Sequence, residues 1–403
     1  MTRPSGASRF AGLDWEFLRL SALGVAAFSG IGIFLPYFPV WLESRGLSEE
    51  RIALILAAPM IVRVVAGPVL TALADRRGDL SGMMAWCALI GGTGYLILGF
   101  LHDFWSILIC ILLLSIAQAP IYPLTDAITM IAVKRRAEEG GPRLDYGRIR
   151  AFGSFSVLAG MLASGTIIGA IPIAGVVWVL VLSDYLTAAV AAFLPKTRPV
   201  EERHIPILPN PIARPVLLAA FIVGIALVQA SHGMVYGFAT LHWKSLGFGA
   251  SYIGFAWAVG VAAEILLFVL AGKFARGTSA PLFLMLGGGG ALIRWVLMAL
   301  TVDPWMIVGL QAMHAFSFGA THLGGIYLLN AMVDDTRRAQ AQGWLQSANA
   351  VCLAGSMALT GVFYARFGGG AYFAMAGMAA AGFLLVCGAL VMRGQPHKSG
   401  VGG

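Results

Sequence analysis

The chain has 403 residues, of which 59% are hydrophobic and 11% charged, with a mean hydropathy of +0.82 and a formal net charge of +8. A soluble domain carries about 25% charged residues, so this composition excludes a water-soluble protein and predicts one that resides in a lipid bilayer. The positive charge does not indicate a nucleic-acid partner, because Lys and Arg gather in short loops between apolar runs, as the positive-inside rule describes.

Apolar windows of about 20 residues predict twelve transmembrane helices. Long runs of this kind exclude an outer-membrane barrel, and helices satisfy their own backbone groups in hydrocarbon. The expected fold is therefore all-α and polytopic, with two six-helix bundles. We expect the helices near residues 14–42, 50–74, 82–101, 105–133, 146–170, 174–194, 214–240, 249–273, 280–300, 304–330, 339–366 and 370–392.

A polar, proline-rich stretch separates the first six helices from the last six. It reads PKTRPVEERHIPILPNPIA and covers residues 195–213. The expected domains are a first bundle over 1–194, a cytoplasmic linker over 195–213 and a second bundle over 214–403.

The basic residues predict the orientation of the chain. With the N-terminus inside, the cytoplasmic loops hold eighteen Lys and Arg residues, and the opposite loops hold only Arg45, Arg51, Lys244 and Arg366. Both termini are therefore expected in the cytoplasm. The N-terminal stretch MTRPSGASRF lacks the apolar core and cleavage site of a secretory signal, so the first helix is expected to be retained, in a bacterial inner membrane.

Motifs for catalysis or metal binding are absent from the sequence. It contains no HExxH, no GxSxG and no GxxxxGK[ST], so neither an enzyme nor an ATP-driven pump is expected. The four cysteines lie in apolar runs without paired spacing, which favours packing over disulfides or metal ligation. We expect no cofactor and no metal.

Five charged residues lie inside the apolar runs, namely Arg63, Asp126, Arg150, Glu264 and Arg294. An ionised side chain at membrane depth is costly unless it is paired or faces water, so this pattern indicates a transport pathway. The segment WLESRGLSEERIALIL (41–56) resembles HWKSLGFGASYIGFAW (242–257), an offset of 201 residues that places Arg63 over Glu264. This similarity predicts a parallel repeat of six helices.

The loop after the second helix carries a first family signature. It reads TALADRRGD (71–79) and resembles the Gly-x-x-x-Asp-Arg-x-Gly-Arg/Lys motif of the major facilitator superfamily, with Asp75, Arg76 and Gly78 as matches. Thr71 and Asp79 depart from the motif. The resemblance implies a gating role for the three matching residues, and an ordinary positive-inside loop is the alternative.

A second resemblance extends over most of the chain. PLTDAI (123–128), LDYGRIRAFGS (144–154), GVAAEILLF (260–268) and IRWVLM (293–298) resemble the oligosaccharide–proton symporter family, and more closely its 3-phenylpropionic acid transporter group. The sugar permeases of that family imply substrate binding by Asp126 and Arg150. A structural ion pair between these two residues is the alternative.

Departures from the sugar permeases argue against a galactoside as substrate. Val157 stands where the permeases have the tryptophan that stacks on the sugar, and Gly325 and Ser317 stand where a helix-ten carboxylate would follow His322 or His314. The proton site of the permeases therefore cannot be transferred to this chain.

Glu264 is the first choice for proton coupling. Burial and a nearby cation shift a carboxyl pKa in opposite directions, so a membrane Glu that faces a movable Arg can change protonation with conformation. Arg294 is the expected partner and Arg63 the second option, while a fixed structural pair is the alternative.

Polar stripes on two helices complete the predicted site. On a regular helix, Gln311, His314 and His322 share one face with Phe318. The histidines are expected to bind a carboxylate or relay protons, with His322 in the coupling set, whereas Phe318 is expected to serve in helix packing. Gln229, His232 and Tyr236 form a similar stripe. His314 and His322 are eight residues apart and have no third ligand, which argues against a metal site.

The sequence thus predicts proton-coupled symport of a small aromatic or carboxylic acid by alternating access. Sugar or nucleoside uptake is the alternative substrate class, and a passive channel is the alternative from another class. Expected partners are the substrate, protons and the bilayer, for a monomer that binds no nucleic acid.

Overall fold

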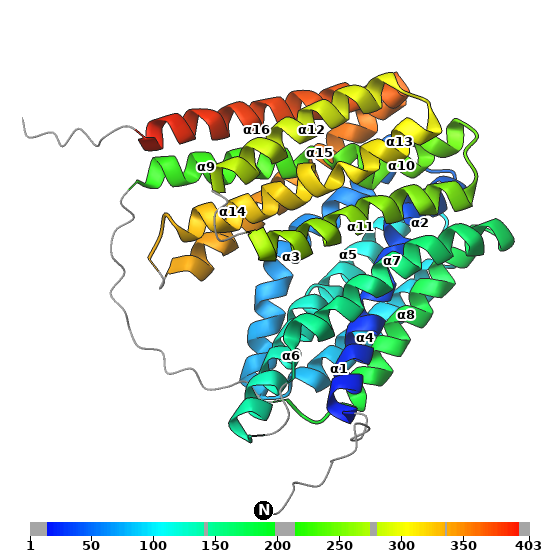
Figure 1. The fold of residues 1–403 in the computed structure, drawn as a ribbon. Helices are drawn as coiled ribbons and strands as arrows, with labels where there is room; N and C mark the ends of the chain where they lie inside the picture. Colours follow the sequence, from blue (N-terminus) through cyan, green and yellow to red (C-terminus); the bar gives the residue numbers. More distant parts are fainter. Residues whose placement is uncertain (1–13, 141–143, 198–213, 275–279, 335–336, 395–403) are drawn as a thin grey trace, which may run out of the picture.

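The structure is a computed structural model that describes residues 14–140, 144–197, 214–274, 280–334 and 337–394. Within these ranges, all regular secondary structure is helical (Figure 1). Most of the predicted linker, residues 198–213, lies outside the described residues.

The helices of the first half are α1 (Trp15–Ser29), α2 (Ile31–Ser44), α3 (Glu49–Arg77), α4 (Leu80–Leu98), α5 (Phe104–Gln118), α6 (Ile121–Glu138), α7 (Tyr146–Ala170) and α8 (Gly175–Ala192). Those of the second half are α9 (Pro215–Ala230), α10 (Gly233–Ser245), α11 (Ala250–Phe274), α12 (Ala280–Leu300), α13 (Pro304–Ala312), the π-helix η1 (Ala315–Ala320), α14 (Thr321–Asn330), α15 (Arg338–Phe367), the 3₁₀-helix η3 (Gly368–Gly370) and α16 (Ala371–Gly394).

These helices confirm the predicted all-α polytopic fold. Ten segments of the described chain are long and apolar enough to cross a membrane. The last of them, Gln340–Arg393, contains both α15 and α16, while residues 304–330 form a further segment divided into α13, η1 and α14. Each of the twelve predicted windows therefore coincides with a helix or a series of helices.

Four spans are interrupted near their middle. The interruptions lie at Gly30, at Ala119–Pro120, at Ser231–His232 and around η1, so they fall in the first and fourth spans of each half. Gly30 and Ser231 are 201 residues apart, which is the offset of the predicted repeat. Because irregular backbone at membrane depth is tolerated only inside protein or beside a cavity, these four spans are the ones expected around a transport pathway.

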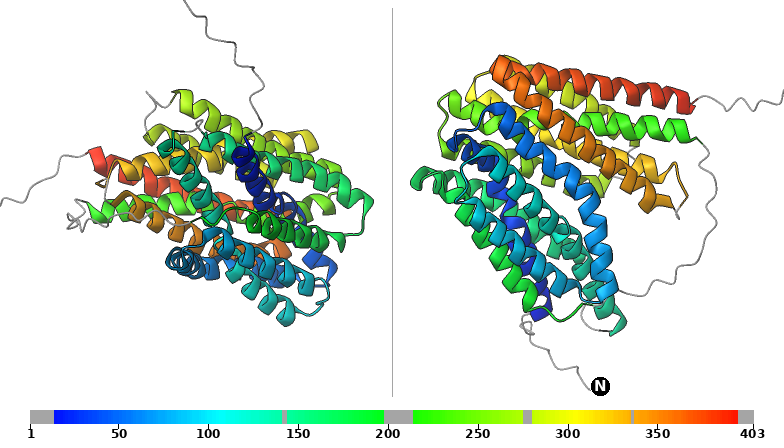
Figure 2. Two further views of the ribbon diagram at one scale, coloured as in Figure 1. Left: turned by 90° about the horizontal axis from the view of Figure 1, so that it is seen from below. Right: turned by 180° about the vertical axis from the view of Figure 1, so that it is seen from behind.

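The two halves meet at one end and diverge toward the other (Figures 1 and 2). The most extensive contacts between them are made by three helix pairs, namely α3 with α15, α7 with α11 and α2 with α10. At the closed end, the Tyr37 hydroxyl donates to the Ala250 carbonyl over 2.8 Å, and Lys244 Nζ lies 2.6 Å from Glu43 Oε2. Glu43 and Lys244 are themselves 201 residues apart.

Glycine permits the closest approach between the halves. A Cβ atom added at Gly254 of α11 would lie 2.5 Å from the Met161 carbonyl oxygen of α7, which is too short for any side chain. The contact between α7 and α11 therefore depends on a residue without a side chain at this position.

The motif after α3 is built around a helix end. Asp75 and Arg76 are exposed in the last turn of α3, and Gly78 follows in the left-handed region with φ 65°, where glycine is favoured. Asp79 accepts a 2.9 Å hydrogen bond from the Gly82 N–H and thereby caps α4. Helix capping therefore explains the departure of Asp79 from the family signature.

Candidate functional site

Arg294 of α12 is the central cation of the second half, and its side chain is 0% exposed. Its Nη2 donates to Gln311 Oε1 and its Nη1 to Ser317 Oγ, both over 2.9 Å. Nη1 also lies 3.2 Å from His314 Nδ1, and the guanidinium carbon lies 4.5 Å from the centre of the Trp295 ring. A buried cation needs such partners, because burial removes its hydration.

Glu264 of α11 joins this cluster through His314. Its Oε2 lies 3.4 Å from His314 Nε2. Arginine has no acceptor atom, so His314 Nδ1 must accept from Arg294 and the imidazole proton then resides on Nε2, facing Glu264. The three residues form a chain of carboxylate, neutral bridge and cation. We name it the Glu264–His314–Arg294 chain.

This geometry differs from the predicted partners of Glu264. The sequence predicts direct contact of the carboxylate with Arg294 or Arg63, but His314 lies between Glu264 and Arg294. Arg63 belongs to the first half, where its Nη2 donates to Gln118 Oε1 over 3.3 Å. The difference arises because α11 and α12 approach each other through the fourth span of their half, which supplies His314.

His232 is fully buried behind the Glu264–His314–Arg294 chain and supports it through Ser317. Its Nδ1 lies 2.9 Å from the Gln229 carbonyl oxygen and its Nε2 3.1 Å from Ser317 Oγ. The carbonyl can only accept, so Nδ1 carries the proton and Nε2 accepts from the Ser317 hydroxyl, which in turn accepts from Arg294. His232 therefore orients Ser317 toward Arg294.

The rings of His314, Phe318 and His322 stack in one row. Their centroids are 5.1 and 6.0 Å apart, with interplanar angles of 15° and 9°. The predicted regular helix over 304–330 is wrong at this point, because η1 is a π-helix that changes the turn between His314 and His322. Such π-segments are frequent at functional sites.

A cavity of about 270 Å³ lies beside this row, between spans seven, ten and eleven. Among the predicted substrate residues, Gln229 and Tyr236 line it, whereas Gln311, His232 and His314 belong to the layer behind. Its remaining lining combines polar and apolar groups: Phe318, His322, Gln346, Asn349, Ala350 and Leu353. The volume and this mixed lining are suited to a small molecule with an apolar body and a polar group.

Sequence reasoning missed Gln346 and Asn349, which both come from α15. Asn349 Oδ1 is buried without a hydrogen-bond partner among the described residues. The signal was available, because two amides three residues apart in an apolar helix fall on one face.

In the first half, the structure joins Asp126 of α6 to Arg150 of α7. Arg150 Nε lies 3.5 Å from Asp126 Oδ1, which also accepts a 3.1 Å hydrogen bond from the Tyr146 hydroxyl. The Arg150 guanidinium carbon lies 4.1 Å from the centre of the Phe28 ring. Both charged side chains are more than a third exposed, so the pair is accessible to a competing carboxylate.

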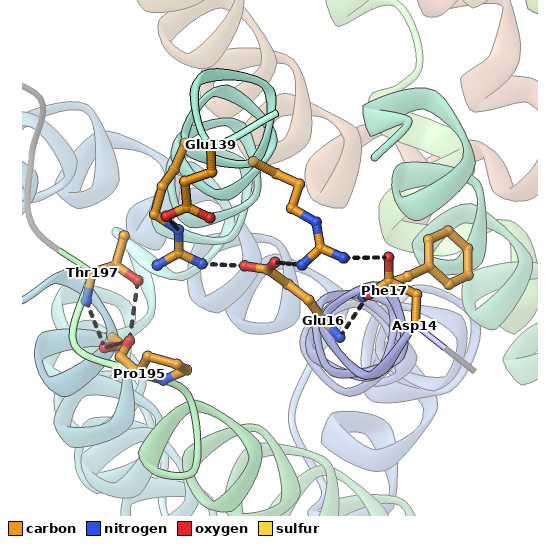
Figure 3. A network of polar contacts seen from close by, with 9 residues as sticks. Asp14, Glu16, Phe17, Glu139, Pro195 and Thr197 are labelled. Atoms are coloured by element: carbon orange, nitrogen blue, oxygen red, sulfur yellow. Dashed lines mark hydrogen bonds and ion pairs between the residues drawn. The ribbon is translucent and has the colours of Figure 1, made fainter. Parts of the chain in front are cut away.

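A separate ionic network lies at the diverging end of the first half (Figure 3). Arg136 contacts Glu16 over 3.0 Å and Asp14 over 3.2 Å, while Arg135 pairs with Glu16 and Glu139. The network borders a cavity of about 910 Å³. Because its acids and bases compensate one another, we interpret it as holding α1 against α6 and not as the substrate site.

A polytopic helical fold with charged side chains beside a cavity between its helices is typical of a membrane transporter. The sequence profile of the MFS_1 like family matches residues 17–375, so the chain belongs to that family and is a transporter of the major facilitator type, not an enzyme.

Known proteins agree with this class. The probable 3-phenylpropionic acid transporter of Escherichia coli (strain K12) is 29% identical over 370 residues, covering 87% of this chain and 91% of that protein. The solved structure of the nucleoside transporter NupG has a TM-score of 0.78 at 17% identity and covers 94% of this chain and 99% of its own. A D-xylose–proton symporter has a TM-score of 0.67 at 14% identity, covering 92% and 96%. These two structures support the fold alone.

Proposed function

We propose that this protein takes up a small organic acid with an aromatic or apolar body, together with protons, across a bacterial inner membrane. The Glu264–His314–Arg294 chain carries the proposal, because it links a membrane carboxylate to a buried cation beside a ligand-sized cavity. The 3-phenylpropionic acid transporter relative favours an aromatic acid as substrate.

The proton and the anion bind together in this mechanism. When Glu264 is ionised, its charge compensates Arg294 through His314. When Glu264 takes up a proton, the uncompensated charge of Arg294 attracts a substrate carboxylate into the adjacent cavity, where the low dielectric strengthens the attraction. His322, which lines the cavity and stacks on Phe318, is the proposed relay for the proton.

The cavity lining supplies the proposed substrate contacts. Phe318 and Tyr236 pack against the apolar body, while Gln229, Asn349 and Gln346 bind the carboxylate as amide donors. Gln311, His314 and His232 position Arg294 and Ser317. In the first half, Arg150 is the second proposed contact: its guanidinium releases the Asp126 carboxylate and binds the substrate carboxylate.

Alternating access requires two bodies that move relative to each other. We propose that these are the bundles over 1–194 and 214–403, connected by the linker 195–213, in a protein that acts as a monomer. With both termini cytoplasmic, the diverging end faces the cytoplasm. Asp75, Arg76 and Gly78 lie at that end of α3, where they are placed to control its closure.

The decisive test is uptake of 3-phenylpropionate into proteoliposomes with an imposed pH gradient. We expect saturable accumulation that follows the gradient, and a weaker response to the gradient in Glu264→Gln with counterflow retained. Glu50→Gln, an exposed acid at the closed end, is the control and should behave as wild type. Gradient-independent uptake would contradict proton coupling, and non-saturating conductance would establish a channel.

A neutral polar substrate is the second candidate. The amides of Gln229, Gln346 and Asn349 can also bind the hydroxyls or ring nitrogens of a sugar or nucleoside. Thermal-shift measurements with 3-phenylpropionate, D-xylose and uridine separate these classes, because only a ligand that binds the folded protein raises its unfolding temperature.

A further inference from the structure

The first half contains a second partly buried carboxylate that the proposed mechanism does not use. Asp184 of α8 accepts a 2.9 Å hydrogen bond at Oδ2 from Gln118 Nε2, and Gln118 Oε1 accepts from Arg63. Arginine only donates, so the amide oxygen of Gln118 must face Arg63 and its NH₂ group must face Asp184. The network therefore fixes the orientation of Gln118 as the bridge between acid and cation.

Asp184 forms no ion pair among the described residues: Arg63 interacts with it electrostatically, but its guanidinium hydrogen-bonds to Gln118. The backbone of α4 packs against the carboxylate so closely that a Cβ atom added at Gly91 would lie 2.6 Å from Asp184 Oδ2. The other titratable groups that interact with Asp184 are Tyr95 of α4 and Tyr122 of α6, and both also interact with Arg63. From α1, the neighbouring polar contact is the hydroxyl of Ser29 on Ser183.

This arrangement resembles that of the second half in its connectivity, although Asp184 lies on the sixth span of its half and Arg294 on the third span of its own. Both halves connect a carboxylate to an arginine through one neutral side chain, Gln118 in the first and His314 in the second. Arg63 and Glu264 occupy equivalent positions of the repeat, 201 residues apart. A membrane acid that reaches its cation only through a neutral bridge is weakly compensated, which favours uptake of a proton.

We propose that Asp184 is a second proton-binding site, coupled to the substrate through Gln118 and Arg63. The inference rests on the proposed proton-coupled function and extends it. One proton adds to the Asp184 carboxylate and one to Glu264, which leaves Arg63 and Arg294 with two uncompensated positive charges. The single substrate anion compensates one of them and the other is the net charge of the loaded carrier, before both protons and the anion are released on the other side. Together with the proton on Glu264, two protons move with each monoanion, so the cycle transfers one net positive charge.

Net charge movement gives a sharp experiment. Proteoliposomes containing the wild type are given 3-phenylpropionate and an interior-negative potential set by potassium and valinomycin. If one net charge moves with each substrate, the accumulation ratio of 3-phenylpropionate should rise tenfold for every increase of about 59 mV in the membrane potential. Asp184→Asn should keep uptake driven by the pH gradient but lose the response to potential. Asp334→Asn, an exposed acid, is the matched control.

The outcomes separate this inference from the function on which it rests. Wild-type uptake that follows the pH gradient but not the potential would overturn the second proton site alone. An unchanged potential response in Asp184→Asn would do the same. Wild type without pH-driven uptake would overturn the proposed function and this inference together. Because the potential response of the wild type needs no variant, the test stands even if Asp184→Asn does not fold.

Discussion

At the scale of single residues, the direction of each hydrogen bond decides the chemistry of the site. Arg294 can only donate, which places the proton of His314 on the side of Glu264. The Gln229 carbonyl can only accept, which sets the tautomer of His232. Two buried histidines thus act as neutral bridges of defined orientation, and neither adds a charge to the bundle.

Arg294→Met should destabilise the protein by about 3–5 kcal/mol, because it leaves Glu264 without its cation and Gln311 without its donor. The stability of Arg294→Lys should lie between that of Arg294→Met and wild type, since one ammonium group cannot reproduce the hydrogen bonds of the planar guanidinium. Thermal unfolding in detergent measures both. Arg148→Met, at an exposed arginine, is the control, and equal stability of Arg294→Met and wild type would contradict the assigned contacts.

Asn349→Ala should weaken binding of 3-phenylpropionate by about 5- to 30-fold, which corresponds to the loss of roughly 1–2 kcal/mol from one buried polar contact. Titration of purified protein by calorimetry gives the affinity. Gln340→Ala removes an exposed amide of the same helix and should leave the affinity unchanged. Equal affinities for both variants would place the substrate elsewhere.

At the scale of secondary-structure elements, interruptions of the helices shape the site. The first and fourth spans of each half are broken, whereas α3, α7, α11 and α12 are continuous. The continuous helices carry Arg63, Arg150, Glu264 and Arg294. The broken spans supply most of the neutral partners, including Gln118, His314 and Ser317. The three arginines and Glu264 thus lie on continuous helices, whereas Asp126 and the neutral bridges lie on interrupted spans.

Gly254→Val should weaken the closed end by about 1–3 kcal/mol, because the added side chain collides with the backbone of α7. The variant is expected to favour the conformation in which α7 and α11 separate. Increased labelling of a cysteine introduced at Tyr37 would report this change. Gly377→Val, at a helical glycine with open space around it, should label as the parent protein does.

At the scale of the whole molecule, the closed end is held by contacts between two halves whose other ends diverge (Figure 1). Lys244 and Glu43 are roughly half exposed, so their ion pair contributes little energy. Its position nevertheless identifies the surfaces that must separate in alternating access.

Joining Glu43→Cys to Lys244→Cys with a cleavable bis-thiosulfonate reagent should stop transport, and a reductant should restore it. The experiment needs a background without the four native cysteines, all of which are free thiols. Each single variant treated in the same way is the control. Full transport by a fully cross-linked protein would exclude separation of the halves at this end.

Much of the fold is predictable, because bilayer thickness sets the length of each apolar run and no tertiary information is needed to count them. Local structure is predicted wrongly where it depends on packing against residues distant in the sequence. The sequence predicts a regular helix over 304–330, but packing around Gly287 and Gly290 brings α12 close to η1 and α14, where a π-turn forms. No local propensity signals such a turn.

Local composition and its cost in lipid are enough to predict the helical membrane architecture, the polar stretch near residue 200 and the charged residues inside the apolar runs. Which of these charges are connected by hydrogen bonds depends on tertiary packing, which local composition does not encode. His314 lies between Glu264 and Arg294, and Gln118 between Asp184 and Arg63, because each bridge lies on a different span from the two groups that it joins. Packing between spans selects such partners, and they cannot be predicted from one amino-acid sequence.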